Sequence, residues 1–223
     1  MTGDQQALRV AQINSDETLS DWRLILGRLR ARFATGSFAS GVELVNAIGE
    51  VSQEVDHYPE VDLRTWHVDV KLISHDLSAV TPRDVRLARR ISQRAAQLGA
   101  EARPREVQSL EIALDTPNYQ GIKPFWRTVL GLADHPKIDK DLEDPAASLP
   151  DLWFQRTEDT DPSRMRFHLD IAVPPDVATE RVAAAVEAGG TLVDDRFAPA
   201  FWVLADAEGN KVCVCTCEGR EDD

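Results

Sequence analysis

Apolar and polar residues in the first hundred positions follow two distinct periods. Over residues 28–34, leucine, alanine and phenylalanine alternate with arginines, and this period of two is typical of a strand with one buried face. Residues 22–26 precede this strand across Gly27, so the two segments predict a β-hairpin. Residues 66–72 alternate in the same way and predict another strand. The polar residues 1–20 before them predict a short helix and a loop.

Two segments of the same region have the helical period instead. Apolar side chains recur on one face over residues 41–56, and Pro59 ends this helix because proline lacks an amide donor and restricts the residue before it. A second helix begins at Thr81, where a proline occupies the first position and Asp84 is placed to complete a capping box. Gly99 ends that helix.

The second half of the chain repeats one order of elements twice. The expected strands and helices are strands 110–114, 151–155, 166–173, 191–193, 201–205 and 211–216, and helices 122–130 and 177–188. Two β-α-β-β-β passes of similar length indicate a duplicated unit. A polar, proline-containing stretch separates this half from the first, so we expect domains at 1–100 and 107–223 joined by a linker at 101–106.

The composition restricts the class of partner. The chain has 223 residues, of which 43% are hydrophobic and 28% charged, the profile of a soluble globular protein. Its 25 lysines and arginines against 38 aspartates and glutamates give a net charge of −13, which disfavours nucleic acid and anionic membrane surfaces as partners. No apolar run is long enough to span a bilayer and no export signal follows Met1, so we expect a cytoplasmic protein.

All three cysteines lie in one run, Cys213, Cys215 and Cys217, with the spacing of a single strand face. Neighbouring thiols on such a face are about 6.6 Å apart, which is too far for an easy disulfide. They are either small apolar side chains packed on a buried strand or ligands for a soft metal ion.

Two histidines at the two ends of the predicted strand are the candidates for proton transfer. His57 follows Asp56 where the first helix ends, and His75 precedes Asp76 where the strand ends. Imidazole has an ordinary pKa of about 6.5, so it can give or take a proton at neutral pH. The alternative is that both are ordinary histidines at the ends of secondary structure.

The order of these elements resembles the pterin-4a-carbinolamine dehydratase family over about residues 22–97. The resemblance rests on a strand hairpin, a helix, His57-Tyr58-Pro59-Glu60, a strand, Ser74-His75-Asp76 and Thr81-x-x-Asp84 leading into Leu87-Ala88. It implies an α+β fold in which a four-stranded antiparallel sheet carries helices on one face. It also implies removal of water from a 4a-hydroxytetrahydropterin by histidine acid/base chemistry, with no cofactor required.

The resemblance assigns roles to individual residues. It makes His57 and His75 catalytic, and it places Tyr58, Pro59 and Asp76 at the pterin-like substrate. Tyr58 stands where the family has a second histidine, and a phenol with a pKa near 10 accepts protons poorly at neutral pH. The tyrosine therefore bears directly on whether the chain is active.

The second half resembles the glyoxalase-like branch of the vicinal oxygen chelate superfamily over about residues 107–217. The residues that carry this resemblance are Phe125-Trp126-x-x-x-Leu130-Gly131, Phe167-His168-Leu169-Asp170 and Asp206-x-Glu208-Gly209-Asn210. It implies a pair of βαβββ modules whose sheets form a cup, often around a divalent metal, with the ligand places at Glu111, His168 and Cys213. A set that contains cysteine suits zinc better than harder cations. The alternative, a cup without metal, is common among such relatives.

Three hypotheses follow for the function. The first is a dehydratase joined to a small-molecule-binding glyoxalase-like domain. The second is a non-catalytic protein that binds pterins or other small molecules, and the third is a metal-dependent lyase or dioxygenase in the second domain. Both families tend to assemble, so we expect a homodimer.

Overall fold

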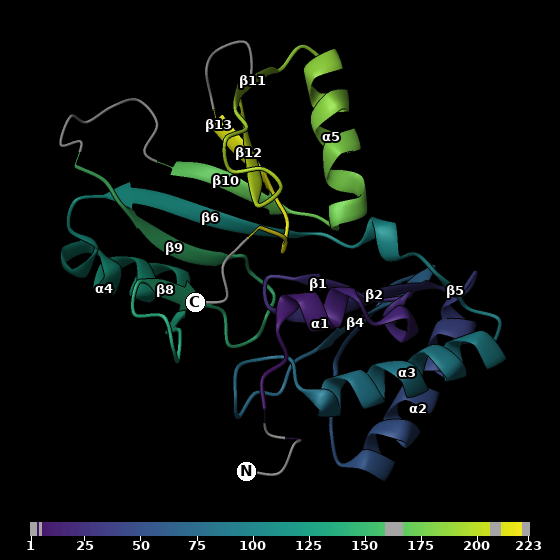
Figure 1. Ribbon diagram of the computed structural model, residues 1–223. Helices are drawn as coiled ribbons and strands as arrows, with labels where there is room; N and C mark the ends of the chain where they lie inside the picture. The colour runs from purple at the N-terminus through teal and green to yellow at the C-terminus, as the bar shows by residue number, and fades with distance from the viewer. Residues whose placement is uncertain (1–3, 5, 159–166, 206–210, 220–223) are drawn as a thin grey trace. The chain divides into compact units, whose positions relative to one another are not determined.

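The computed structural model describes residues 4, 6–158, 167–205 and 211–219 (Figure 1). The described chain separates into two units between Val107 and Gln108. The run 206–210, which contributed to the glyoxalase-like resemblance, lies outside the described residues. None of the described helices combines the length and the apolar character that crossing a bilayer requires.

The first unit is an antiparallel sheet with the strand order β1-β2-β4-β3 and a short β5 paired with β2. Its elements are α1 Val10–Asn14, η2 Glu17–Leu19, β1 Arg23–Ile25, β2 Arg28–Ala34, α2 Phe38–Val55, β3 Glu60–Leu63, β4 His67–Leu72, α3 Pro82–Gln97, β5 Glu101–Ala102 and η3 Pro104–Glu106. Helices α2 and α3 lie side by side on one face of the sheet (Figure 1). This arrangement confirms the expected α+β fold, and the short β5 adds a fifth strand to the four that were expected.

The alternating pattern of β2 and β4 produces the core of this unit. Leu29, Phe33 and Val70 point to the helix side and are at most 1% exposed, whereas the alternate arginines lie on the outer face. On that outer face Arg32 pairs with Asp69, and its Nε and Nη2 each lie 2.7 Å from a carboxylate oxygen. Burial of the apolar row, at about 1.5–3 kcal/mol for each large side chain, stabilises the sheet against the helices.

Two short strands of the first unit were not expected from the pattern of its residues. Strand β3 is an edge strand with partly exposed ends and an exposed centre, so its residues lack the apolar alternation that identifies a half-buried strand. The stretch 101–106, expected to be a linker, forms β5 and η3, and the Arg103 amide donates to the Arg32 carbonyl at 2.7 Å. A strand of two residues has no periodic pattern, so β5 could not be predicted from the sequence.

The second unit is an eight-stranded sheet with the order β11-β12-β13-β10-β6-β9-β8-β7. Its elements are β6 Ser109–Thr116, α4 Tyr119–Leu130, β7 Ala133–Asp134, β8 Asp141–Glu143, β9 Asp151–Arg156, β10 Phe167–Ala172, α5 Pro175–Glu187, β11 Thr191–Asp194, β12 Phe201–Ala205 and β13 Lys211–Cys215. The predicted double β-α-β-β-β order is therefore present, with β6 and β10 antiparallel at the centre. Each of these two strands also pairs in parallel with the last strand of its own module.

One face of this sheet is apolar and covered by the helices. Val177 and Val182 of α5 pack with Leu204 and Val214, and Tyr119 and Ile122 of α4 pack on a second cluster centred on Leu142, Leu152 and Phe154. Because neighbours along a strand point to opposite faces, the intervening residues lie on the other face. That other face carries Glu111, Trp153, His168, Asp170 and Cys213.

The pairing of β5 leads to a test of where the first unit ends. A chain of residues 1–107 should have a larger free energy of unfolding than one of residues 1–100, because the shorter chain loses the β5 hydrogen bonds and the Arg103 amide contact. We expect a difference on the order of 2 kcal/mol in the free energy of unfolding, measured by urea titration with circular dichroism. Equal stability of the two chains would show that residues 101–107 contribute nothing to the unit.

Candidate functional site

A buried carboxylate, Asp84, is the centre of the polar cluster in the first unit. Asp84 is 0% exposed and lies in the first turn of α3, where the Thr81 amide donates to its Oδ2 at 2.8 Å. The Ser74 hydroxyl donates to the same oxygen at 2.7 Å, and the Thr81 hydroxyl lies 3.1 Å from it. The capping box expected from the sequence therefore also joins the helix to the turn that follows β4.

The second oxygen of Asp84 holds His57. Helix α2 ends at Val55, Asp56 adopts a left-handed backbone with φ 49°, and the His57 amide donates to the Ser52 carbonyl at 3.2 Å. This sharp exit turns the imidazole back toward α3, so that its Nε2 lies 2.8 Å from Asp84 Oδ1. Only 11% of the His57 side chain remains exposed.

The bond between His57 and Asp84 determines which nitrogen of the imidazole is available for chemistry. An ionised carboxylate only accepts hydrogen bonds, so the proton between Asp84 and His57 is carried by Nε2. In the neutral imidazole, Nδ1 then has the free lone pair. Among the described residues no hydrogen bond to Nδ1 is found, and this nitrogen is the proton acceptor that the arrangement provides.

The cluster keeps Asp84 ionised despite its burial. Burial alone raises the pKa of a carboxyl group, but the hydrogen bonds from His57, Ser74 and the Thr81 amide outweigh it and lower the pKa of Asp84. The site therefore contains an ionised carboxylate in direct hydrogen-bond contact with His57.

His75 lies on the turn that Ser74 begins. The Leu77 amide donates to the Ser74 carbonyl and the Ser78 amide to the His75 carbonyl, which leaves the His75 and Asp76 side chains exposed. Asp76 pairs with Arg83 at 2.6 Å. This hydrogen bond lowers the pKa of Asp76, with smaller contributions from the charges of Arg83 and His57.

A second ion pair lies near His75. Lys71 Nζ is 2.8 Å from Glu60 Oε2, which joins the end of β4 to the start of β3. Burial opposes the ionisation of Glu60, but Lys71, Arg28 and His75 together lower its pKa. His57 and His75 are thus each within electrostatic range of a carboxylate, Asp84 for His57 and Glu60 for His75.

The other residues expected at the substrate are near this cluster in the chain. Tyr58 is 57% exposed, and Pro59 follows it in the extended segment between α2 and β3. The phenol of Tyr58 makes no hydrogen bond to any described residue. Sequence reasoning gave Asp84 the role of a helix cap only, since nothing in the spacing shows that a residue 27 positions after His57 contacts its ring.

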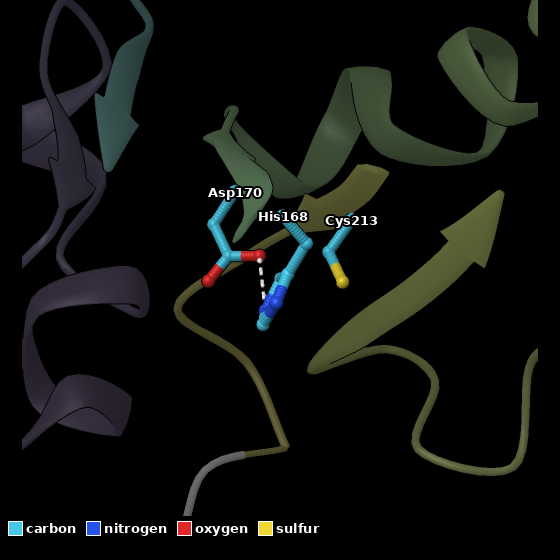
Figure 2. Close-up of side chains that lie close together, drawn as sticks. All are labelled: His168, Asp170 and Cys213. Atoms are coloured by element: carbon cyan, nitrogen blue, oxygen red, sulfur yellow. Dashed lines mark ion pairs between the residues drawn. The ribbon is translucent and has the colours of Figure 1, made fainter. Parts of the chain in front are cut away.

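The outer face of the second unit holds a different cluster. Ligand atoms of His168, Asp170 and Cys213 all lie within 4.8 Å of one another, and Glu111 is not among them (Figure 2). Burial and the nearby Asp170 and Cys215 raise the pKa of the Cys213 thiol well above its ordinary value. Cys213 is therefore not a ready thiolate nucleophile.

Comparison with known proteins agrees with the division into two units. Residues 6–94 match the family described as pterin 4 alpha carbinolamine dehydratase, and residues 111–215 match a glyoxalase-like domain. A protein of Mycolicibacterium smegmatis, provisionally named a pterin-4-alpha-carbinolamine dehydratase, is 31% identical over 75 residues, or 34% of this chain and 80% of its own length. The chain belongs to the pterin-4a-carbinolamine dehydratase family. A similarly named Aquifex aeolicus protein is 29% identical over 77 residues, 34% of this chain and 78% of its own.

Two solved structures show limited similarity to the chain. One, titled transcriptional coactivator/pterin dehydratase from Brucella melitensis, has 23% identity, covers 40% of this chain and 99% of its own, and gives a TM-score of 0.38. A glyoxalase/bleomycin resistance protein/dioxygenase superfamily member from Vibrio splendidus has 13% identity, covers 49% of this chain and 99% of its own, and gives a TM-score of 0.35.

The lowered pKa of Asp84 predicts how acid destabilises the unit. A carboxyl group with a depressed folded-state pKa stabilises the fold above its unfolded pKa of about 3.9, and that contribution is lost as the pH falls through the folded value. Asp84→Asn should lower the free energy of unfolding at pH 7 by about 2 kcal/mol. The gap between variant and wild type should narrow below about pH 4, as measured by urea titration across pH. Asp76→Asn, at an exposed pair, is the control and should change stability little. A gap that does not vary with pH would contradict the charged role of Asp84.

Proposed function

We propose that the first unit dehydrates a 4a-hydroxytetrahydropterin, with His57 and His75 sharing the proton transfers. The observation that carries this proposal is the bond between His57 Nε2 and the buried Asp84, because it leaves Nδ1 as an oriented proton acceptor. Family membership supports the dehydratase activity and the pterin-like substrate class, and the histidine geometry supports acid/base chemistry.

The reaction requires one proton donor and one proton acceptor. An imidazolium protonates the 4a-hydroxyl oxygen, the C4a–O bond breaks, and water leaves with the bonding electron pair. The N5–H bond then supplies the electrons of a new C4a=N5 double bond, and its proton passes to a neutral imidazole. Donor and acceptor exchange protonation states in one turnover, so solvent must return one proton and remove another.

The surroundings of the two histidines favour different roles. His57 is nearly buried against a carboxylate, which stabilises the imidazolium that forms when Nδ1 accepts the N5 proton. His75 is exposed on a turn, where it can exchange protons with solvent and act as the donor to the leaving hydroxyl. No step in this scheme needs a metal ion or an organic cofactor.

A second candidate is a protein that binds pterins without turning them over. The observation that favours it is Tyr58, which is exposed and stands where the family has a histidine. In this case the ring of Tyr58 would contact the pterin, and the dyad of His57 and Asp84 would serve as a hydrogen-bonding site.

Removal of either histidine should abolish most of the dehydration. His57→Ala and His75→Ala should each lower kcat by about 10²–10⁴-fold, the usual contribution of a positioned acid or base, in a spectroscopic assay of 4a-hydroxytetrahydropterin decay. A chelator should leave the rate unchanged. The matched control is His67→Ala, since His67 lies at the opposite end of β4 and pairs only weakly with Asp69 at 3.7 Å. Equal loss in all three variants, or a wild-type protein that binds pterin but has no turnover, would rule out the catalytic proposal.

Tyr58 separates the two candidates. Tyr58→His should raise the dehydration rate by about tenfold or more, because a third imidazole can join the proton transfer, while pterin affinity measured by fluorescence titration changes little. Tyr58→Phe is the control for the hydroxyl group alone. If Tyr58→His creates turnover where the wild type has none, the binding function is the correct reading; if neither protein binds pterin, both candidates fail.

A further inference from the structure

The position of His75 depends on the backbone that carries it. The residue lies on the turn after β4, its side chain is exposed, and its imidazole makes no hydrogen bond to any described residue. Because the side chain has no such contact of its own, the contacts that fix the turn also determine where the imidazole lies.

The turn has little to hold its shape by itself. Within it, the Leu77 amide donates to the Ser74 carbonyl at 3.0 Å and the Ser78 amide to the His75 carbonyl at 3.2 Å. Ser78 adopts a left-handed backbone with φ 41°, which is unfavourable for a residue with a side chain. Such a conformation persists only where the surrounding structure imposes it, so the turn needs contacts from outside.

The first turn of α3 supplies these contacts on both sides of His75. Before His75, the Ser74 hydroxyl donates to Asp84 Oδ2 at 2.7 Å. After His75, Asp76 Oδ1 accepts from Arg83 Nη2 at 2.6 Å. Since Arg83 and Asp84 are consecutive residues, one place on the helix holds the chain immediately before and immediately after His75.

The same turn of α3 also holds the other histidine. The second oxygen of Asp84 lies 2.8 Å from His57 Nε2. The hydrogen bond from Arg83 lowers the pKa of Asp76, and the charges of Arg83 and His57 add to the effect, so Asp76 is within electrostatic range of His57. The first turn of α3 therefore determines how the two imidazoles lie relative to each other.

The pair of Arg83 and Asp76 has more effect on geometry than on stability. The Asp76 side chain is 55% exposed, and ion pairs at such sites contribute little to the free energy of unfolding. The Nε of Arg83 is buried and finds no hydrogen-bond partner among the described residues, which costs further free energy. The consequence of the pair is thus a fixed turn.

We propose that Arg83 and Asp76 are positioning residues for His75, and that Asp76 acts through the turn without contacting the pterin. The sequence resemblance instead gives Asp76 a place at the substrate, so the two roles make different predictions. This inference rests on the proposed function, because the position of His75 matters only if His75 takes part in the proton transfer.

Steady-state kinetics of the full chain with 4a-hydroxytetrahydropterin test the proposal. Arg83→Gln and Asp76→Asn should each lower kcat by about 10–100-fold and change KM by less than about threefold, because a displaced acid slows the chemical step and leaves binding intact. Arg83→Lys keeps the positive charge and should recover part of the loss. Arg89→Gln is the matched control and should keep the wild-type kcat, since Arg89 lies on the same helix and pairs with Asp16 at 2.7 Å.

A double variant shows whether Arg83 acts through His75. Once His75→Ala has removed the imidazole, Arg83→Gln should have no further effect, and the double variant should stay within about twofold of His75→Ala alone. Independent damage to the fold would instead multiply the two losses. Circular dichroism and the melting temperature of each variant establish that it is folded.

Hydrogen exchange followed by NMR tests the turn without relying on turnover. The Leu77 and Ser78 amides should exchange about tenfold faster in Arg83→Gln than in the wild type. The Ile91 amide, in the middle of α3, should keep its rate. A wild-type protein without turnover would end the proposed function, whereas this measurement would still decide whether Arg83 orders the turn.

Three results would overturn the inference. The first is a wild-type kcat in Arg83→Gln or, in a protein without turnover, wild-type exchange of the Leu77 and Ser78 amides in that variant. The second is a raised KM with an unchanged kcat, which would place Asp76 at the substrate. The third is a double variant that is slower than His75→Ala by the whole factor that Arg83→Gln costs alone.

Discussion

The carboxylate of Asp84 joins three segments of the first unit. Its Oδ2 receives the Thr81 amide at the start of α3 and the Ser74 hydroxyl from the turn after β4, and its Oδ1 receives the imidazole of His57 from the end of α2. A buried negative charge is costly unless it is surrounded by donors. The fold therefore has to bring these segments together, and in doing so it sets the orientation of His57.

His57 in the first unit and His168 in the second are oriented by different kinds of contact. In the first unit, the imidazole is held at the end of the sheet by a helix cap and a turn, and the oxygens of its carboxylate are saturated with hydrogen bonds. In the second unit, His168 lies on the face of a sheet between Asp115 and Asp170.

The periodic elements were predictable, and the contacts between them were not. Alternation in β2 and β4 and the helical period of α2 and α3 follow from burial of one face, so the residue types alone reveal them. The short β3 and β5 lack a buried face with a period, and the sequence could not show them. The contact between His57 and Asp84 depends on how far α2 extends before Asp56 reverses the chain, which is a property of packing.

In the second unit, too, the sequence could not show which residues lie together. Both Glu111 and Asp170 have the residue type and the strand face that a metal ligand requires, and they even lie opposite each other in the register. What distinguishes them is that Asp170 is also opposite Cys213 and has His168 two positions before it. Only the pairing of β10 with β13 provides that information, and the position carried over from the superfamily resemblance indicated the other member of the pair.

The exposure of Tyr58 shows that packing constrains this position little. More than half of its side chain is exposed, and it makes no hydrogen bond to a described residue, so packing places little constraint on which side chain stands there. Asp84 is the opposite case, because replacing it would leave several donors in the interior without an acceptor. The side chain at position 58 can therefore change with little effect on the stability of the fold.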